Sequence, residues 1–210
     1  MRWLIALVLL LWAGPIHAED ARSLASRVQR VYDDTKTYQA KFRQTYVIKV
    51  QNVRKVSSGR VAFAKPGKLS FRYDEGNRVV SDGKTVKVYE RGNQQMYENE
   101  VARSQYPAAL AFLIGEGRLS RDFKLRLLDA KRMKVKNAFV LEGVPRDASP
   151  AYEKILFYID AATAQVRRVL VLDAQGNRNR FDFSQPVLNK PVTGGEFRFT
   201  PPRGTTVVKP

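Results

Sequence analysis

The amino-acid sequence predicts a mainly β protein, built as one antiparallel barrel or strongly curled sheet. From Tyr38 to Val50, largely apolar side chains at even positions alternate with mostly polar ones at odd positions. This is the period of a strand with one buried face. Similar segments follow at short intervals, separated by residues that favour turns. Roughly ten or more antiparallel strands in one domain favour a barrel or a curled sheet.

The chain begins with the pattern of a secretory signal peptide. Arg2 gives a positive start, an unbroken apolar run covers Trp3–Trp12, and small residues lead to Ala18 before two acidic residues. This order predicts cleavage after Ala18. The alternative is a membrane anchor, but spanning a bilayer takes about 20 apolar residues. We therefore expect a cleaved segment at 1–18 and a single, unanchored periplasmic domain at 19–210.

Removing this segment limits the chemistry of the mature chain. The only His (His17) lies within it, and the sequence contains no Cys. A Ser-His-Asp triad, a Cys nucleophile and a His-ligated metal site are therefore excluded. We expect no enzymatic activity, no catalytic residue, no metal and no cofactor.

The net charge of the whole chain is +17, with Lys and Arg spread along the sequence. Export and this spread argue against nucleic acid as a partner. Two interpretations remain open: a solvated basic surface, or contact with anionic partners such as phospholipid head groups, lipopolysaccharide or acidic protein surfaces.

The predicted elements start with a helix from about Asp20 to Thr35, where apolar residues recur at helical spacing. Strands follow, with a hairpin signal at Ser81-Asp82-Gly83. Besides 38–50, the expected strands include or cover residues 61–63, 69–73, 79–80, 86–89, 95–97, 124–128, 138–144, 153–160, 165–173 and 178–184.

One segment breaks this pattern. Pro107–Ile114 is rich in Ala and Leu, and Pro suits the first turn of a helix. Leu119–Phe123 is expected to add another turn. Apolar side chains occupy more than one side of the predicted helix, so it is either buried on both sides or covers an apolar cavity.

Five motifs resemble those of a known family, the bacterial outer-membrane lipoprotein carriers (LolA). They occur in the family's order and extend over essentially the whole chain after the signal segment. The matching stretches are Phe42–Thr45 (FRQT), Gly59–Pro66 (GRVAFAKP), Leu69–Tyr73 (LSFRY), Val80–Thr85 (VSDGKT) and Phe197–Gly204 (FRFTPPRG).

The resemblance implies an unclosed antiparallel β-barrel of about 11 strands, with an N-terminal helix and a short helical lid over an apolar cavity. It also implies a monomeric periplasmic chaperone that shields the acyl chains of lipoproteins. Such a carrier takes its cargo from an inner-membrane lipoprotein-releasing ABC transporter and delivers it to an outer-membrane acceptor. Ordinary core packing is the alternative role for each residue of the expected cavity lining: Phe42, Tyr46, Ile48, Val61, Phe63, Leu69, Phe71, Leu110, Leu113 and Ile114.

One departure from the family concerns the residue before Pro66. The family has an Arg there that latches the lid, and this chain has Lys65. Lys offers a compact ammonium in place of a planar fork of donors. Lys65 is thus either a less rigid lid latch or a surface residue at a turn.

Two rival functions use the same expected fold. The first is a carrier of another lipid, such as a glycolipid or a phospholipid. The second is a periplasmic regulatory protein that senses lipid and binds a membrane partner. A hydrolase is disfavoured because the mature chain has neither His nor Cys.

Overall fold

A computed structural model describes residues 19–100 and 117–209 of the chain. Twelve strands and two helices lie in these ranges. The helices are α1 (Ala21–Asp33) and α2 (Leu119–Asp122). The strands are β1 (Thr37–Ile48), β2 (Val53–Ala64), β3 (Lys68–Tyr73), β4 (Arg78–Asp82), β5 (Thr85–Glu90), β6 (Gln95–Glu100), β7 (Phe123–Leu128), β8 (Ala138–Pro145), β9 (Lys154–Asp160), β10 (Val166–Leu172), β11 (Arg178–Leu188) and β12 (Thr206–Val208).

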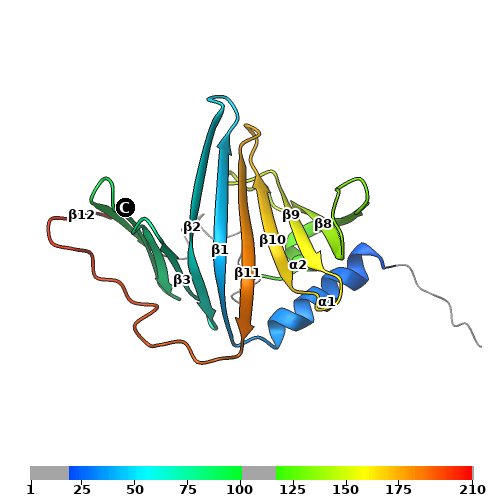
Figure 1. Cartoon of the computed structure of the whole chain (residues 1–210), viewed down its shortest axis with the longest axis horizontal. Coiled ribbons are helices and arrows are strands. Elements are labelled where there is room, and N and C mark those ends of the chain that lie inside the picture. Colours follow the sequence, from blue (N-terminus) through cyan, green and yellow to red (C-terminus); the bar gives the residue numbers. More distant parts are fainter. Residues whose placement is uncertain (1–18, 101–116, 210) are drawn as a thin grey trace, which may run out of the picture.

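All twelve strands form one curled sheet, shown in Figure 1, in the order β12-β6-β5-β4-β3-β2-β1-β11-β10-β9-β8-β7. Only β12 runs parallel to its neighbour, β6. The sheet does not close, because β12 and β7 are its two edges. The expectation of a mainly β, unclosed antiparallel barrel is confirmed.

The long hairpin of β1 and β2 forms the middle of the sheet. Its pairing runs without a break from Thr37 opposite Ala64 to Ile48 opposite Val53. On the other side, β1 pairs with β11, which lies far away in the sequence. These two pairings join the two halves of the sheet, β2 to β6 and β11 to β7.

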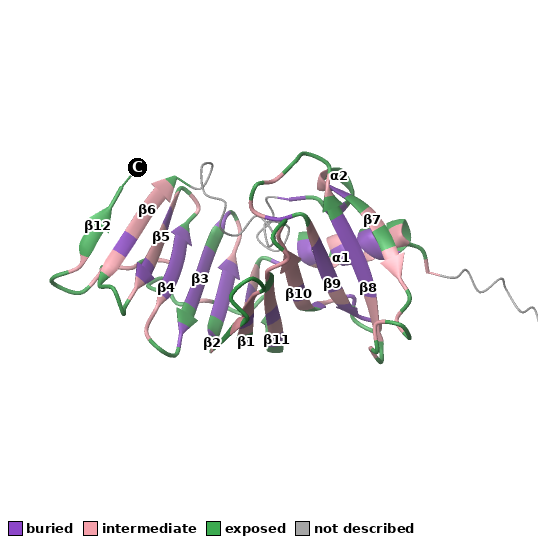
Figure 2. Cartoon of the chain, turned by 90° about the horizontal axis from the view of Figure 1, so that it is seen from above, coloured by how far each residue is buried: buried purple, intermediate pink, exposed green. Residues whose placement is uncertain are grey.

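Helix α1 begins where the expected helix begins, at an N-cap formed by Asp20. The Asp20 carboxylate accepts hydrogen bonds from the backbone N–H groups of Arg22 and Ser23, at 2.8 and 2.7 Å. Such a cap satisfies donors that the first turn leaves without partners. The helix lies against the half of the sheet that contains β8 to β10 (Figures 1 and 2). Its buried side chains are Leu24, Ala25, Val28 and Tyr32.

These helical side chains and one face of the sheet form a single hydrophobic core. We call this face, on the side of α1, the inner face. Figure 2 shows buried residues along most strands, in line with the alternation in the sequence. Within the described part of the chain, no helix is long and apolar enough to cross a membrane.

The segment between β11 and β12 crosses the outer face of β3 to β5. Glu196 accepts hydrogen bonds from Ser70 at 2.7 Å and from Arg72 at 3.0 Å. Further along, the Phe199 ring packs on Tyr89, with ring centroids 5.2 Å apart. Neither this crossing nor β12 was expected from the sequence.

Candidate functional site: the inner apolar face

Strand register brings most of the expected cavity residues onto one face. Val61 on β2 lies opposite Phe71 on β3, and Phe63 lies opposite Leu69. Phe42 on β1 lies opposite Gly59 on β2, one inward-facing position along from the Ala40–Val61 pair. Because side chains two residues apart point to the same side of a strand, all five apolar side chains share the inner face.

The rings on this face pack against one another. The centroid of Phe42 lies 5.2 Å from that of Phe71 and 5.0 Å from that of Tyr73. Phe63 and Phe71 are 5.9 Å apart. The ring pairs meet edge to face, a preferred geometry for aromatic pairs. Phe42, Phe63 and Phe71 are at most 2% exposed.

Three more rings, which were not among the expected lining residues, belong to the same array. Phe181 on β11 lies 5.8 Å from Phe71, and Phe183 lies 6.3 Å from Tyr38. The alternation of the strand expected at 178–184 was the available signal, because residues 181 and 183 share one face. Their pairing with β1 is non-local, so the sequence did not indicate which rings they meet.

Tyr46 and Ile48 occupy the far end of β1, where burial is only partial. Tyr46 lines a pocket of about 290 Å³ together with Gln44, Val171 and Asn179. Gln44 donates a hydrogen bond to Asn179 at 2.8 Å and accepts one from the Tyr73 hydroxyl, also at 2.8 Å. The apolar array therefore ends at a pair of amide side chains, next to the partly buried end of β1.

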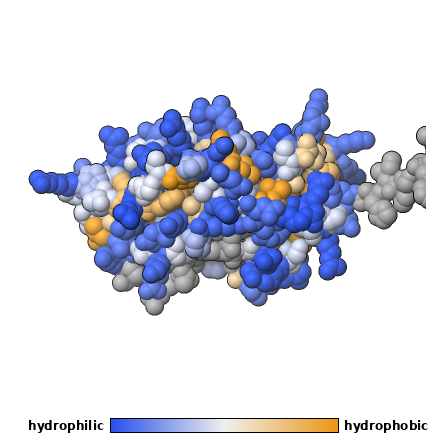
Figure 3. Space-filling model, turned by 90° about the horizontal axis from the view of Figure 1, so that it is seen from below, coloured by the Kyte–Doolittle hydropathy of each residue, from blue (hydrophilic) through white to orange (hydrophobic). Residues whose placement is uncertain are grey.

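The remaining lining candidates are Leu110, Leu113 and Ile114, and they lie outside the described residues. Their place over the inner face stays a prediction. Seen from below, hydrophilic side chains cover most of the surface, while apolar atoms gather in a broken band across the middle (Figure 3).

Lys65 lies between β2 and β3 and reaches the end of α1. Its ammonium donates to the backbone carbonyl of Tyr32 and, at 3.0 Å, to that of Asp33. The last carbonyls of a helix lack partners within the helix and carry the negative end of its dipole, so a Lys there is favourable. Lys65 thus joins a turn of the sheet to α1. Its role toward the segment at 107–114 stays a prediction.

The inner face is electrically neutral where it is most buried. Burial raises the pKa of Tyr32, although the hydrogen bond from the Val166 N–H to its hydroxyl lowers it by a smaller amount. Burial also raises the pKa of Tyr38, and the nearby Tyr32 adds to this. Both phenols therefore remain protonated over the ordinary pH range. Such a face offers apolar and aromatic contact to a ligand.

In residues 19–100 and 117–209, no group of three or more His, Cys, Asp or Glu side chains is placed to hold a metal ion.

Comparison with known structures supports the fold. A crystal structure of an uncharacterised conserved protein from Thermus thermophilus superposes with a TM-score of 0.55 at 16% identity. The match covers 90% of this chain and 98% of that one.

Comparison with known sequences identifies the family. An outer-membrane lipoprotein carrier protein of Methylibium petroleiphilum is 30% identical over 98% of this chain and 96% of its own length. One from Nitrosomonas europaea is 28% identical over 93% of this chain and 91% of its own length. The family model "Outer membrane lipoprotein carrier protein LolA" matches residues 33–200. The chain therefore belongs to the LolA family of outer membrane lipoprotein carrier proteins.

Proposed function

We propose that this protein carries outer-membrane lipoproteins through the periplasm, with their acyl chains against the inner apolar face. In this proposal it receives them from an inner-membrane ABC transporter and delivers them to an outer-membrane acceptor. The family match over residues 33–200 and the names of its relatives support the cargo. The signal-peptide pattern of residues 1–18 supports the compartment.

The observation that carries the proposal is the aromatic array on the inner face. Moving an acyl chain of about 16 carbons out of water and against an apolar surface is favourable by on the order of 10 kcal/mol, at about 0.8 kcal/mol for each methylene. The rings of Phe42, Phe63, Phe71 and Phe181 offer a continuous apolar surface of the right kind. These rings contact one another, so a bound chain must separate them or lie beside them, near Tyr46.

Helix α1 and the segment at 107–114 are the proposed covers of this surface. The helix contributes four buried side chains, and polar contacts hold its C-terminal end: the Tyr32 hydroxyl accepts from Val166, and Lys65 donates to two carbonyls. Individual bonds of this kind contribute about 1 kcal/mol each. A cover attached in this way is suited to movement during loading and release.

A binding experiment tests the cavity. A fluorescent fatty acid should bind the mature protein with roughly micromolar affinity, about 8 kcal/mol. Tyr46→Glu should weaken binding at least tenfold, because an unpaired carboxylate would be buried beside acyl carbon. Val47→Glu is the matched control, since Val47 is the next residue on β1 and points to the opposite face.

A folded Tyr46→Glu variant that binds the probe as tightly as the wild type would remove Tyr46 from the cargo surface. Failure of the wild type to bind any fatty acid would reject the carrier proposal. To identify the cargo, lipids co-purified from the periplasm can be analysed by mass spectrometry. Diacylated and triacylated peptides support lipoprotein cargo, whereas glycolipid or phospholipid alone would identify a carrier of another lipid.

A further inference from the structure

A row of four cations crosses the outer face of the sheet. Lys41 on β1 lies opposite Arg60 on β2, which lies opposite Arg72 on β3, which lies opposite Arg78 on β4. Side chains directly opposite on neighbouring antiparallel strands are about 5 Å apart at Cβ, and like charges there are destabilising. The fold therefore keeps an unfavourable arrangement of charge at this place.

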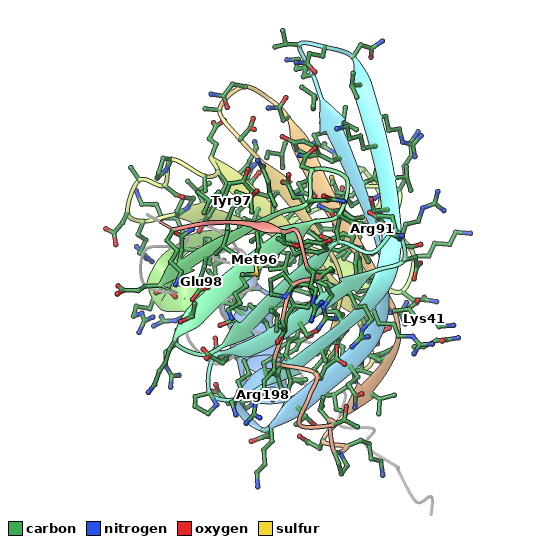
Figure 4. All side chains as sticks on the ribbon, turned by 90° about the vertical axis from the view of Figure 1, so that its left-hand side faces the viewer. Lys41, Arg91, Met96, Tyr97, Glu98 and Arg198 are labelled. Carbon is green, nitrogen blue, oxygen red and sulfur yellow. The ribbon has the colours of Figure 1, made fainter. Side chains whose placement is uncertain are left out.

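Only two of these four cations have an ion-pair partner within the described chain, and they share one carboxylate. Glu196 forms ion pairs with Arg72 at 3.0 Å and with Arg78 at 3.5 Å. In residues 19–100 and 117–209, Lys41 and Arg60 have neither an ion pair nor a side-chain hydrogen bond, and both are exposed. Lys41 projects from β1 on the outer side of the sheet (Figure 4).

The two unpaired cations face a pocket of about 470 Å³ on the outer face. Arg72 and Glu196 also line it, so three cations and one carboxylate meet there, with a net charge of +2. The other side chains around it are polar but uncharged, or apolar, and include Gln39, Ala62, Gln185, Val187 and Thr193.

We propose that this pocket binds a phosphate ester. A guanidinium presents a planar fork of donors that matches phosphate oxygens, and an ammonium adds a compact charge. The net charge of +2 attracts both the near-dianion of a phosphate monoester and the monoanion of a phosphodiester head group. Val187, which is 44% exposed, gives the pocket an apolar side for the organic part of the ester.

This site lies on the opposite side of the sheet from the aromatic array. Along β1, Phe42 points inward and Lys41 outward, as alternate residues of a strand must. A phosphate ester can therefore bind while the inner face holds an acyl chain. Two sources offer the same chemistry: the head group of an anionic phospholipid in a membrane surface, and a soluble phosphate ester.

The test compares the mature wild-type protein with a Lys41→Gln/Arg60→Gln double variant. The matched control is Lys131→Gln/Arg132→Gln, which removes the same charge from two exposed residues in the loop between β7 and β8. One arm titrates glycerol 3-phosphate by calorimetry. The other sediments the protein with vesicles of phosphatidylglycerol and phosphatidylcholine, or of phosphatidylcholine alone.

We expect the double variant to bind at least one of the two phosphate probes about 25-fold more weakly. This corresponds to about fivefold for each of the two charges removed. The control variant should lose much less. Weakened binding of glycerol 3-phosphate identifies a soluble ester as a ligand, and weakened binding of phosphatidylglycerol vesicles alone identifies a membrane head group. The proposal is overturned if the wild type binds neither probe, or if the two double variants lose affinity equally. Binding of the fatty-acid probe, measured on the same proteins, reports separately on the inner face.

Discussion

The ammonium of Lys65 donates a hydrogen bond of 3.0 Å to the backbone carbonyl of Asp33, at the last residue of α1. The same ammonium also donates to Tyr32. The turn after β2 and the end of the helix are therefore held by one flexible side chain. This contact is a natural point at which the attachment of α1 can be changed without altering the apolar core.

Lys65→Leu should lower the free energy of unfolding by about 1–2 kcal/mol, because two carbonyls at the helix end lose their donor. Amide hydrogen exchange should speed up in the last turn of α1 more than in the sheet. Lys68→Leu, at an exposed position three residues away, is the control for removing a Lys. Equal exchange in α1 for the wild type and Lys65→Leu would contradict the role given to this contact.

A second prediction for Lys65 concerns cargo release. If α1 must be re-attached to expel lipid, Lys65→Leu should slow transfer of a radiolabelled lipoprotein to acceptor membranes by roughly fivefold, the effect of about 1 kcal/mol on a two-state cover. Lys65→Arg should match the wild type or exceed it, since Arg supplies more donors in a fixed fork. Equal transfer rates for all three proteins would leave Lys65 a purely structural residue.

Several features could be predicted because their signals are local. The alternation around Phe42 indicated the inner face, and the Ser81-Asp82-Gly83 signal indicated the β4–β5 hairpin, where Asp82 accepts from the N–H of Lys84 at 2.8 Å. The first half of β2 was missed because polar residues such as Arg54 and Ser58 hide the alternation, and the strand exists there through its pairing with β1.

The features that the sequence did not indicate depend on contacts between distant segments. Strand β12 has three residues, too few to show a period, and it forms beside β6 after a long crossing of the outer face. The pocket with Lys41 and Arg60 depends on the register of β1 and β2 and on Glu196, which lies more than 130 residues after Arg60. In the sequence, the cations of this pocket could not be distinguished from the many other Lys and Arg residues of the chain.

Replacing Phe71 should test both the stability of the core and the binding of cargo. It is fully buried and contacts the rings of Phe42 and Phe63, so Phe71→Ala should lower the free energy of unfolding by about 3–5 kcal/mol. The cavity left behind lies on the proposed acyl-chain surface. A saturating fatty acid should therefore raise the melting temperature of Phe71→Ala by more than that of the wild type. A fatty acid that stabilises neither protein would show that this array is only core.

Gly59 on β2 has no room for a side chain beside β3. A Cβ built at this position would lie 2.0 Å from the backbone oxygen of Arg72 and 3.0 Å from the Phe42 ring. Since the oxygen belongs to a paired strand, it cannot move away easily, and Gly59→Ala should destabilise the fold by about 3 kcal/mol in urea denaturation. At Gly194 a Cβ would meet nothing within 4 Å, so Gly194→Ala is the control and should be near neutral. A neutral Gly59→Ala would show that the strands can separate at this point.

Because of Glu196, the attachment of the segment between β11 and β12 to the outer face should weaken at acidic pH. Burial tends to raise the pKa of its carboxyl, but the hydrogen bond from Ser70 and the charges of Arg72 and Arg78 outweigh this, and the pKa lies below its ordinary value of 4.5. A group whose pKa is lower in the folded state stabilises that state above its unfolded pKa, and the contribution is lost as the pH falls through the folded pKa. Cleavage of the 191–205 segment by an acid-active protease should therefore become faster as the pH is lowered from about 6 to below 4.5. In Glu196→Gln the segment should be cleaved readily at pH 6, with little further change on acidification. A wild-type profile as flat as that of Glu196→Gln would show that this carboxylate does not hold the segment in place.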